Sequence, residues 1–372
     1  MAGEWEYRCE VCGHREPLTS GAWRCPECGG AFGLSGEPPL TPAAIDPKLP
    51  GLWRYQAVLP VDFSAARPLG EGMTPLVRGA LAERPVWFKF DALLPSGSFK
   101  DRGAALLAPH LRARGRRRIV VDSSGNAAAA MAAYSAACGL ECAVYAPAAT
   151  SPGKLAQSRA YGATVTLVEG SRDDVARAAQ QAAEADESAF YASHNWHPLF
   201  AEGVKTWLLE VWEQLGFRLP AACFVPTGGG SAFVGAWRAL KSLPGPWPRL
   251  IAAQPAACAP VMAAVGSDDI APVTPGQTIA EGTKIGAPAR GRQILAAIRE
   301  TGGGARAVGE DEIVAALREL WEQGLYVEPT AAVGAAACRQ AIAAGALPPG
   351  EIVVLLTGSG LKATDTVRAI LG

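Results

Sequence analysis

One lysine stands in a sequence context that suits it for covalent chemistry. Residues 95–103 read Pro-Ser-Gly-Ser-Phe-Lys-Asp-Arg-Gly, so small residues and Phe99 precede Lys100, and Asp101 and Arg102 follow it at once. A lysine amine held in this way is suited to form a Schiff base with a carbonyl group of a cofactor or substrate. The alternative is an ordinary lysine at the start of a surface helix, and the segments further along the chain favour the first interpretation.

Polar residues follow an apolar run and open an alanine-rich helical stretch in the segment Ser123-Ser124-Gly125-Asn126. Free backbone N–H groups at the start of a helix can bind an anion, and a substrate carboxylate would fit there. The side-chain amide of Asn126 can hydrogen-bond a phenolate oxygen. A simple helix N-cap has the same pattern, so the motif carries little weight alone.

A glycine loop lies between another apolar run and a helical stretch. Residues 226–231 read Pro-Thr-Gly-Gly-Gly-Ser, so Gly228, Gly229, Gly230 and Ser231 are contiguous. Three glycines let the backbone wrap round a phosphate with its N–H groups turned inward. A dinucleotide-binding loop is the competing interpretation, but that loop has spaced glycines and an acidic residue about 20 positions further on. Contiguous glycines fit a monophosphate better.

A hydroxyl follows the last apolar run, in the segment 356–362, which reads Leu-Thr-Gly-Ser-Gly-Leu-Lys. A side chain at the carboxyl end of a parallel strand faces the crevice where such sheets bind ligands. Thr357 could therefore hydrogen-bond a pyridine nitrogen. A neutral partner of this kind would leave the nitrogen largely unprotonated and the ring a moderate electron sink.

Four cysteines near the start of the chain are spaced like the ligands of a zinc ribbon. They form two Cys-x-x-Cys pairs, Cys9 with Cys12 and Cys25 with Cys28, with 12 residues between the pairs. Two tight turns would present four thiolates to one tetrahedral cation, for which Zn²⁺ is the expected choice. Such a site has no open coordination position, so we expect a structural role, with docking or interface contacts for residues 1–35. A redox-active pair is the weaker interpretation because no βαβ pattern surrounds the cysteines.

The rest of the chain alternates short apolar runs with helical stretches, after a linker rich in proline and glycine at 36–51. This alternation predicts an α/β fold with parallel-rich sheets covered by helices on both faces. The predicted strands span 119–121, 142–145, 165–168, 223–225, 250–253 and 352–356. The predicted helices span 126–138, 172–186, 203–215, 232–240, 310–323 and 330–344.

Composition and charge exclude several classes of protein. The chain has 372 residues, of which 49% are hydrophobic and 19% charged, enough for a large core and two or more domains. Its formal net charge of −1 lacks the broad attraction of a nucleic-acid binder, so no nucleic-acid partner is expected. The sequence has no long apolar span and no signal-peptide pattern, so the predicted location is cytoplasmic, with no membrane partner. The five remaining cysteines are expected to be free, buried thiols.

These segments together resemble the threonine synthase family of fold-type-II pyridoxal-phosphate (PLP) enzymes. The resemblance covers about residues 69–366, in matching order. Its motifs are Gly-Glu-Gly-x-Thr-Pro-Leu at 70–76, Ser-Phe-Lys-Asp-Arg-Gly at 98–103, Gly-Lys-Leu-Ala-Gln at 153–157, Tyr-Gly-Ala at 161–163, Glu-Gly-x-Lys-Thr at 202–206 and Thr-Gly-x-Gly-Leu-Lys at 357–362.

The resemblance implies a role for each of the residues singled out above. Lys100 would carry PLP as a Schiff base and act as base and acid, and Asn126 would contact the ring oxygen. Residues 228–231 would bind the cofactor phosphate, and Thr357 would contact the pyridine nitrogen. The remaining two residues, Ser124 and Gly125, would help to hold the substrate carboxylate.

The resemblance also implies an architecture. It predicts two lobes with PLP in the cleft between them, and a separate zinc ribbon at 1–35. The large lobe would comprise 36–105 and 205–372, and the small lobe 106–204. The expected partners are a small amino-acid substrate and a second copy of the chain in a homodimer.

Two positions depart from the threonine synthase pattern and leave the reaction open. Ala127 stands where the family has threonine, and Phe200 stands where it has an arginine suited to bind phosphate. The expected reaction is the conversion of O-phosphohomoserine and water to L-threonine and phosphate. The alternative is β-elimination or β-replacement on a serine- or threonine-derived amino acid, because residues 228–230 and 279–282 look more like serine/threonine dehydratases.

Other side chains could compensate for the missing arginine or line a different substrate pocket. Four lysines are the candidates for replacement charge: Lys154, Lys205, Lys284 and Lys362. Three residues are candidates for a different pocket: His194, Asn195 and His197. These three could equally be loop residues at a surface turn.

Overall fold

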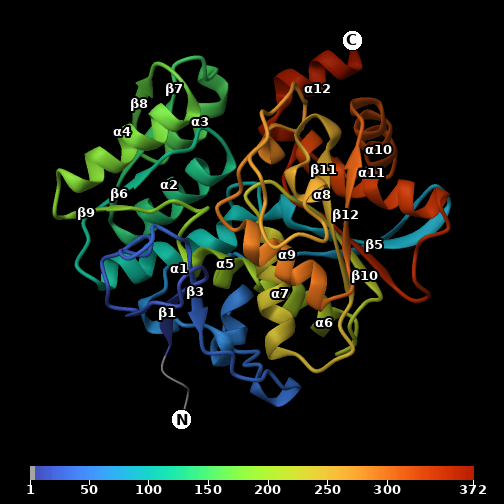
Figure 1. The fold of residues 1–372 in the computed structure, drawn as a ribbon, viewed down its shortest axis with the longest axis horizontal. Helices are drawn as coiled ribbons and strands as arrows, with labels where there is room; N and C mark the ends of the chain where they lie inside the picture. Colours follow the sequence, from blue (N-terminus) through green and yellow to red (C-terminus); the bar gives the residue numbers. More distant parts are fainter. Residues whose placement is uncertain (1–4) are drawn as a thin grey trace.

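The largest element of the fold is a six-stranded sheet, in a computed structural model that describes residues 5–372. The strand order is β12-β11-β10-β13-β5-β4, and the right-hand half of Figure 1 contains this sheet. Neighbouring strands run parallel except β4 and β5, which form an antiparallel hairpin at one edge. The strands are β4 (Leu76–Leu81), β5 (Arg84–Phe90), β10 (Ala222–Pro226), β11 (Arg249–Pro255), β12 (Gly304–Val308) and β13 (Ile352–Leu356).

Helices cover both faces of this sheet, which explains the continuous apolar runs of its central strands. All residues of β10 and β13 are buried. Cys223 and Val225 of β10 pack in one core with helices α6, α7 and α9, whereas Phe224 packs in a second core with α10 and α11. These helices are α6 (Thr206–Gln214), α7 (Ser231–Ser242), α9 (Gly291–Glu300), α10 (Glu310–Glu322) and α11 (Pro329–Ala343).

A second, four-stranded sheet has the order β8-β7-β6-β9 and is parallel throughout. It lies to the left in Figure 1, with helices α2, α3 and α4 around it. Its strands are β6 (Arg118–Val121), β7 (Glu141–Pro147), β8 (Thr164–Val168) and β9 (Ala189–Tyr191). The three helices are α2 (Asn126–Cys138), α3 (Pro152–Ala160) and α4 (Arg172–Glu184).

A small antiparallel sheet near the N-terminus carries the four paired cysteines. Its order is β2-β1-β3, with β1 (Glu6–Cys9), β2 (Arg15–Pro17) and β3 (Phe32–Ser35). The sheet packs on the body of the protein through aromatic side chains. The Trp23 ring lies 4.8 Å from Tyr191 and 5.5 Å from Trp196, and the Tyr7 ring lies 5.8 Å from His197.

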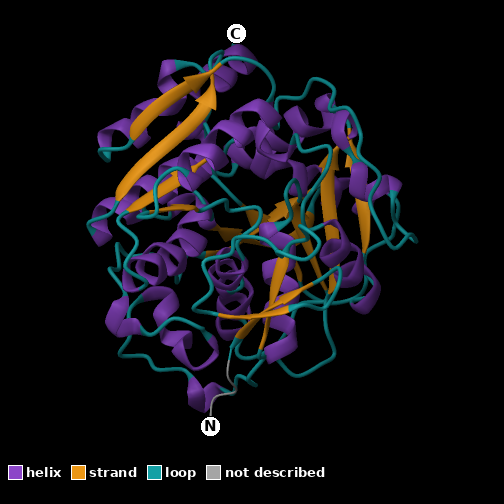
Figure 2. Ribbon diagram, turned by 60° about the vertical axis from the view of Figure 1, so that its left-hand side comes forward, coloured by secondary structure: helices purple, strands orange, loops and turns teal. Residues whose placement is uncertain are grey.

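The remaining helices join these units, and Figure 2 shows how helices enclose the strands. They are α1 (Lys100–Ala113), α5 (Pro198–Val204), α8 (Pro260–Ala263) and α12 (Thr364–Leu371). Short 3-10 turns lie at Pro42–Ala44, Gly51–Val58, Phe63–Ala65, Asp91–Leu93, Ala256–Cys258, Glu281–Thr283 and Gly360–Lys362. Among the described residues, no helix has the length and apolar character needed to cross a membrane.

The structure confirms the predicted α/β fold, and each of the six predicted strands is present. One predicted helix is wrong in detail. The stretch 203–215 is not continuous, because α5 ends and α6 begins on either side of Lys205, whose Nζ turns to Glu202 at 2.5 Å. The boundaries predicted for the ribbon and the two lobes stay a prediction.

Candidate active site and metal centre

A cavity of about 430 Å³ lies where loops at the carboxyl ends of parallel strands from the two larger sheets meet. One loop follows β6 of the small sheet, and two others follow β10 and β13 of the large sheet. Open α/β sheets bind ligands at this end of their strands. The cavity is lined by all nine residues predicted for cofactor and substrate binding: Lys100, Ser124, Gly125, Asn126, Gly228, Gly229, Gly230, Ser231 and Thr357.

Lys100, the first residue of α1, directs its amine into this cavity. Its Nζ lies 3.2 Å from Ser231 Oγ and 4.5 Å from the centre of the Phe99 ring. Burial lowers the pKa of Lys100 to about 7, with the nearby guanidinium of Arg172 acting in the same direction. A large share of the amine is therefore unprotonated near neutral pH, and the unprotonated amine is the form that attacks a carbonyl carbon.

The two charged residues after Lys100 hold the start of α1 in place. The Asp101 carboxylate accepts hydrogen bonds from the backbone N–H (2.6 Å) and the hydroxyl (2.5 Å) of Ser96. Arg102 is fully buried, and its guanidinium pairs with Asp91 (2.8 Å) and Glu210 (2.5 Å). A buried charge needs such partners to offset its desolvation. The contacts of Asp101 and Arg102 thus fix the first turn of α1, which begins at Lys100.

The last residue of the motif, Gly103, must be a glycine because a phenylalanine ring occupies the space where a side chain would lie. A Cβ atom at position 103 would lie 2.4 Å from the ring of Phe200, which is fully buried. The same ring has its centre 5.6 Å from Lys100 Nζ but is not part of the cavity wall. Phe200 therefore supplies apolar packing at the position where the family has a charge.

The glycine loop forms a close-fitting wall of the cavity. A Cβ atom on Gly228 would lie 2.9 Å from the carbonyl oxygen of Gly282, and one on Gly229 would lie 2.1 Å from Asn195 Oδ1. Gly230 has a φ of 89°, which favours glycine, and precedes the first residue of α7. Only a side-chain-free backbone fits here, and its N–H groups lie at the start of a helix, where anions bind.

Asn126 has a buried partner that the sequence analysis missed. Its Nδ2 donates a hydrogen bond of 2.9 Å to Oε1 of Glu328, which precedes α11 and also lines the cavity. Burial raises the pKa of Glu328 to about 7. The acidic residue before Pro329 is a weak sequence signal, because a helix start has the same pattern. Glu328 fixes the orientation of the Asn126 amide toward the cavity.

Thr357 lines the cavity as predicted, and its hydroxyl has no partner among residues 5–372. The side chain is only 2% exposed. A buried hydroxyl without a hydrogen bond is costly, so such a group at a cavity wall indicates a bound polar partner. A ring nitrogen would satisfy it.

The three residues considered as the lining of a different substrate pocket do not all lie at the cavity. His194 and Asn195 line the cavity, whereas His197 does not. The His197 ring packs edge-on against Phe190 at 5.5 Å, and its Nδ1 accepts the backbone N–H of Leu199 at 3.3 Å. His197 is thus a buried packing residue, and its assignment to a pocket is wrong.

The four lysines considered as replacements for the missing arginine also differ in whether they line the cavity. Lys154, Lys284 and Lys362 line the cavity, and so does Arg172, which the sequence analysis missed. Lys205 does not line the cavity: it is buried, with Nζ 2.5 Å from Glu202 and 5.3 Å from the centre of the Trp5 ring. Its assignment as a replacement cation is therefore wrong.

The four paired cysteines come together as a compact cluster. Their sulfur atoms all lie within 4.8 Å of one another. Cys9 Sγ is 3.5 Å from Cys28 Sγ, and Cys12 Sγ is 3.6 Å from Cys25 Sγ. Four Zn–S bonds of about 2.3 Å in a tetrahedron would separate the sulfurs by about 3.8 Å, so the cluster fits Zn²⁺. Of the five other cysteines, which were expected to be buried thiols, four are buried and Cys138 is partly exposed.

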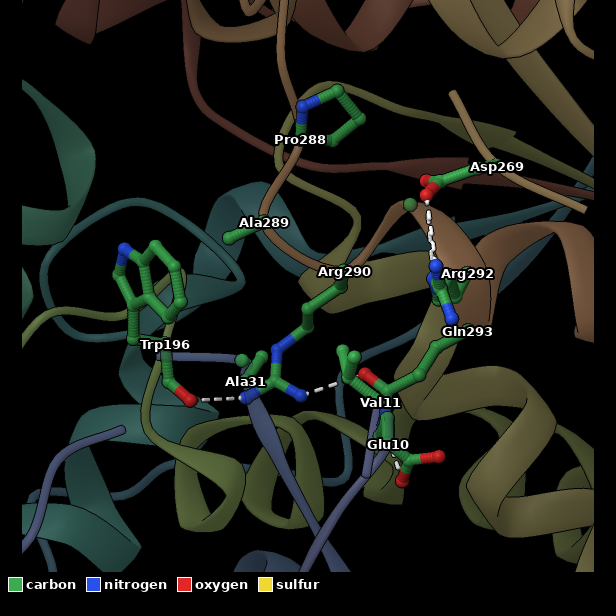
Figure 3. A pocket seen from close by; sticks show the side chains of 12 residues that line it. Glu10, Val11, Ala31, Trp196, Asp269, Pro288, Ala289, Arg290, Arg292 and Gln293 are labelled. Atoms are coloured by element: carbon green, nitrogen blue, oxygen red, sulfur yellow. Dashed lines mark hydrogen bonds and ion pairs between the residues drawn. The ribbon is translucent and has the colours of Figure 1, made fainter. Parts of the chain in front are cut away.

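A buried arginine connects the ribbon to the cavity, across a second cavity of about 210 Å³ (Figure 3). Arg290 donates hydrogen bonds to the carbonyl oxygens of Phe32 in β3 (3.1 Å) and Trp196 (2.6 Å). Trp196 directly follows Asn195, which lines the larger cavity. The ribbon is distant from the cavity in sequence. Two hydrogen bonds from Arg290 nevertheless join its strand β3 to Trp196, the residue next to the cavity wall.

Comparisons with known proteins agree with this site. The family model for pyridoxal-phosphate-dependent enzymes matches residues 68–358. The threonine synthase of Methanocaldococcus jannaschii is 33% identical over 97% of this chain and 94% of its own length, and that of Mycobacterium leprae is 34% identical over 84% and 88%. Among solved structures, the serine racemase of Dictyostelium discoideum is 27% identical and covers 77% of this chain and 92% of its own, with a TM-score of 0.67. A solved threonine deaminase is 29% identical, with the same coverage and TM-score. The chain belongs to the family of pyridoxal-phosphate-dependent enzymes, with the fold-type-II architecture that its sequence predicted.

Proposed function

We propose that this PLP-dependent lyase converts O-phosphohomoserine and water to L-threonine and phosphate. The observation that carries the proposal is the convergence of all nine predicted residues on one cavity, in a chain that resembles threonine synthases over nearly its whole length. The cytoplasmic location and the homodimer stay predictions.

The cavity fits PLP on structural grounds. The unpartnered Thr357 hydroxyl suits the ring nitrogen, the glycine wall from Gly228 to Gly230 suits the phosphate, and the Lys100 amine suits the aldehyde carbon. Asn126 would meet the ring oxygen, with Glu328 holding its amide in place. When bound, PLP supplies an electron sink for charge that develops at the substrate carbons.

The chain's own residues would handle the substrate and its protons. Ser124 and Gly125 line the cavity just before α2, where backbone N–H groups can hold the α-carboxylate. The Lys100 Nζ, with its pKa lowered to about 7, can accept and return a proton near neutral pH. Ser231 Oγ, 3.2 Å from Nζ, orients the amine.

The alternative reaction is β-elimination or β-replacement on an amino acid derived from serine or threonine. Two observations favour it. Phe200 is buried beside Gly103 and presents no charge to the cavity, and Ala127 has no hydroxyl to offer. Two solved structures with more than 25% identity to this chain are a serine racemase and a threonine deaminase.

A substrate screen on the purified holoenzyme separates the two reactions. Incubation with O-phosphohomoserine should release phosphate and form an equal amount of threonine. Incubation with L-serine or L-threonine should form little 2-oxoacid. The proposal fails if no threonine forms at any phosphohomoserine concentration while a serine-type substrate is consumed.

A further inference from the structure

A dianionic leaving group needs a cation near the reacting carbons, and the expected arginine is absent at position 200. This need rests on the proposed function. Arginine is well suited to such a group because its planar donors match two oxygens of one phosphate. The residue that binds the leaving group must therefore be sought among the cationic side chains that line the cavity.

Most of these cations already have partners. Lys154 forms an ion pair with Glu281, and Lys362 donates to Gln157 and to the carbonyl oxygen of Ser96. Lys284 has a single long hydrogen bond of 3.4 Å to Gln277. Recruitment of Lys154 or Lys362 by a substrate would therefore break an existing interaction.

Arg172 differs from these lysines. It is the first residue of α4, it lines the cavity, and it is exposed. Within residues 5–372 its guanidinium has no ion pair within 4.0 Å, although burial raises the pKa of the Asp122 carboxyl and the charge of Arg172 acts to lower it. Its positive charge reaches the reacting groups, because it contributes to the lowered pKa of both Lys100 and His194. A guanidinium carries five N–H donors, and that of Arg172 belongs to a residue of the cavity lining.

We propose that Arg172 is the specificity-determining residue that binds the anionic leaving group of the substrate. It binds a tetrahedral dianion such as a phosphate monoester through two parallel N–H···O bonds. The cation comes from α4, beside the small sheet, whereas the glycine loop and Thr357 belong to loops of the large sheet. The substrate therefore lies between groups from both sheets when its phosphate meets Arg172.

The test compares Arg172→Gln with Arg177→Gln in the holoenzyme. Arg177 is a matched control on the same helix, 63% exposed in its side chain and paired with Asp174. Inorganic phosphate is titrated into each protein and its binding is measured by calorimetry. The glycine loop is expected to hold the PLP phosphate, so the titration reports a separate anion site. The kcat/KM for O-phosphohomoserine is measured in parallel, and L-serine serves as a substrate without a phosphate.

Arg172→Gln should weaken phosphate binding and lower kcat/KM for O-phosphohomoserine by about 10- to 100-fold, as expected for a lost charge-assisted pair. The kcat/KM for L-serine should fall less than that for O-phosphohomoserine, the melting temperature should stay unchanged, and Arg177→Gln should resemble the wild type. The inference is overturned if Arg172→Gln binds phosphate as the wild type does, or if Lys284→Gln causes the loss instead. It is also overturned if the wild-type holoenzyme binds no phosphate. If phosphate binding depends on Arg172 but no threonine forms, the proposed reaction fails and the anion site stands.

Discussion

Replacement of Arg290 by methionine should detach the cysteine-bearing ribbon from the wall of the active site. Methionine keeps much of the side-chain volume but leaves the carbonyl oxygens of Phe32 and Trp196 without their donor. The contact to Phe32 is buried and that to Trp196 is partly buried, and an unsatisfied buried group costs about 1–3 kcal/mol. The two lost hydrogen bonds together would destabilise the docked ribbon by about 2–4 kcal/mol. This change would raise the population of molecules with an undocked ribbon by about 30- to 1,000-fold.

The measurement is hydrogen exchange over residues 190–197, together with the rate at which a chelator removes metal from the ribbon. Both should increase in Arg290→Met. Arg292→Met is the matched control, because Arg292 lies two residues further on in α9, but its side chain is 50% exposed and pairs with Asp269 at 3.1 Å. A surface pair of this kind contributes about 0–1 kcal/mol. Equal exchange and equal metal release in the two variants would refute the reasoning.

Three further predictions concern the cavity. Lys100→Ala should lose the absorbance of lysine-bound PLP and lower turnover by several orders of magnitude; a borohydride-reduced PLP adduct mapped to any other lysine would contradict this. Thr357→Ala should keep PLP bound, since the phosphate loop and the Lys100 linkage provide most of the anchoring, but should change the absorbance spectrum and lower activity; a wild-type spectrum and rate would exclude the hydroxyl as the ring-nitrogen partner. Burial raises the pKa of Glu328 to about 7, so the folded protein keeps a proton that the unfolded chain loses, and this group lowers the stability of the cofactor-free protein as the pH rises from about 5 to 7. Melting temperatures across this range should fall less in Glu328→Gln, and identical pH profiles would count against a buried, protonated Glu328.

The strands at the centre of the two parallel sheets were predictable because burial on both faces gives them continuous apolar sequences. Strands that lack this pattern were not predicted. The hairpin of β4 and β5 includes Arg78 and Pro85, and β12 reads Gly-Ala-Arg-Ala-Val. Helix α3 was missed because it is short and has only two buried residues, Leu155 and Ser158. Edge strands and surface helices take their structure from their neighbours, which local sequence does not reveal.

The cavity residues were predictable for a different reason. Each lies in a local unit of strand, loop and helix, and the carboxyl ends of parallel strands bring such loops to one place. The residues that were missed act on positions far away in the sequence. Glu328 holds Asn126 across 202 positions, and Arg290 reaches Phe32 across 258. Neither contact leaves a local signature, because a helix start and an amphipathic helix explain the same residues.

At position 200 the chain departs from the family motif, and the structure changes how this departure is interpreted. From sequence, Phe200 is a lost phosphate ligand, which argues against a phosphorylated substrate. In the structure its ring fills the space above Gly103 and lies near the Lys100 amine, outside the cavity wall. An apolar ring there helps to keep the amine unprotonated, because a desolvated amine resists charging. The replacement charge and the lowered pKa are linked, because the guanidinium of Arg172 lines the cavity and also acts to lower the pKa of Lys100.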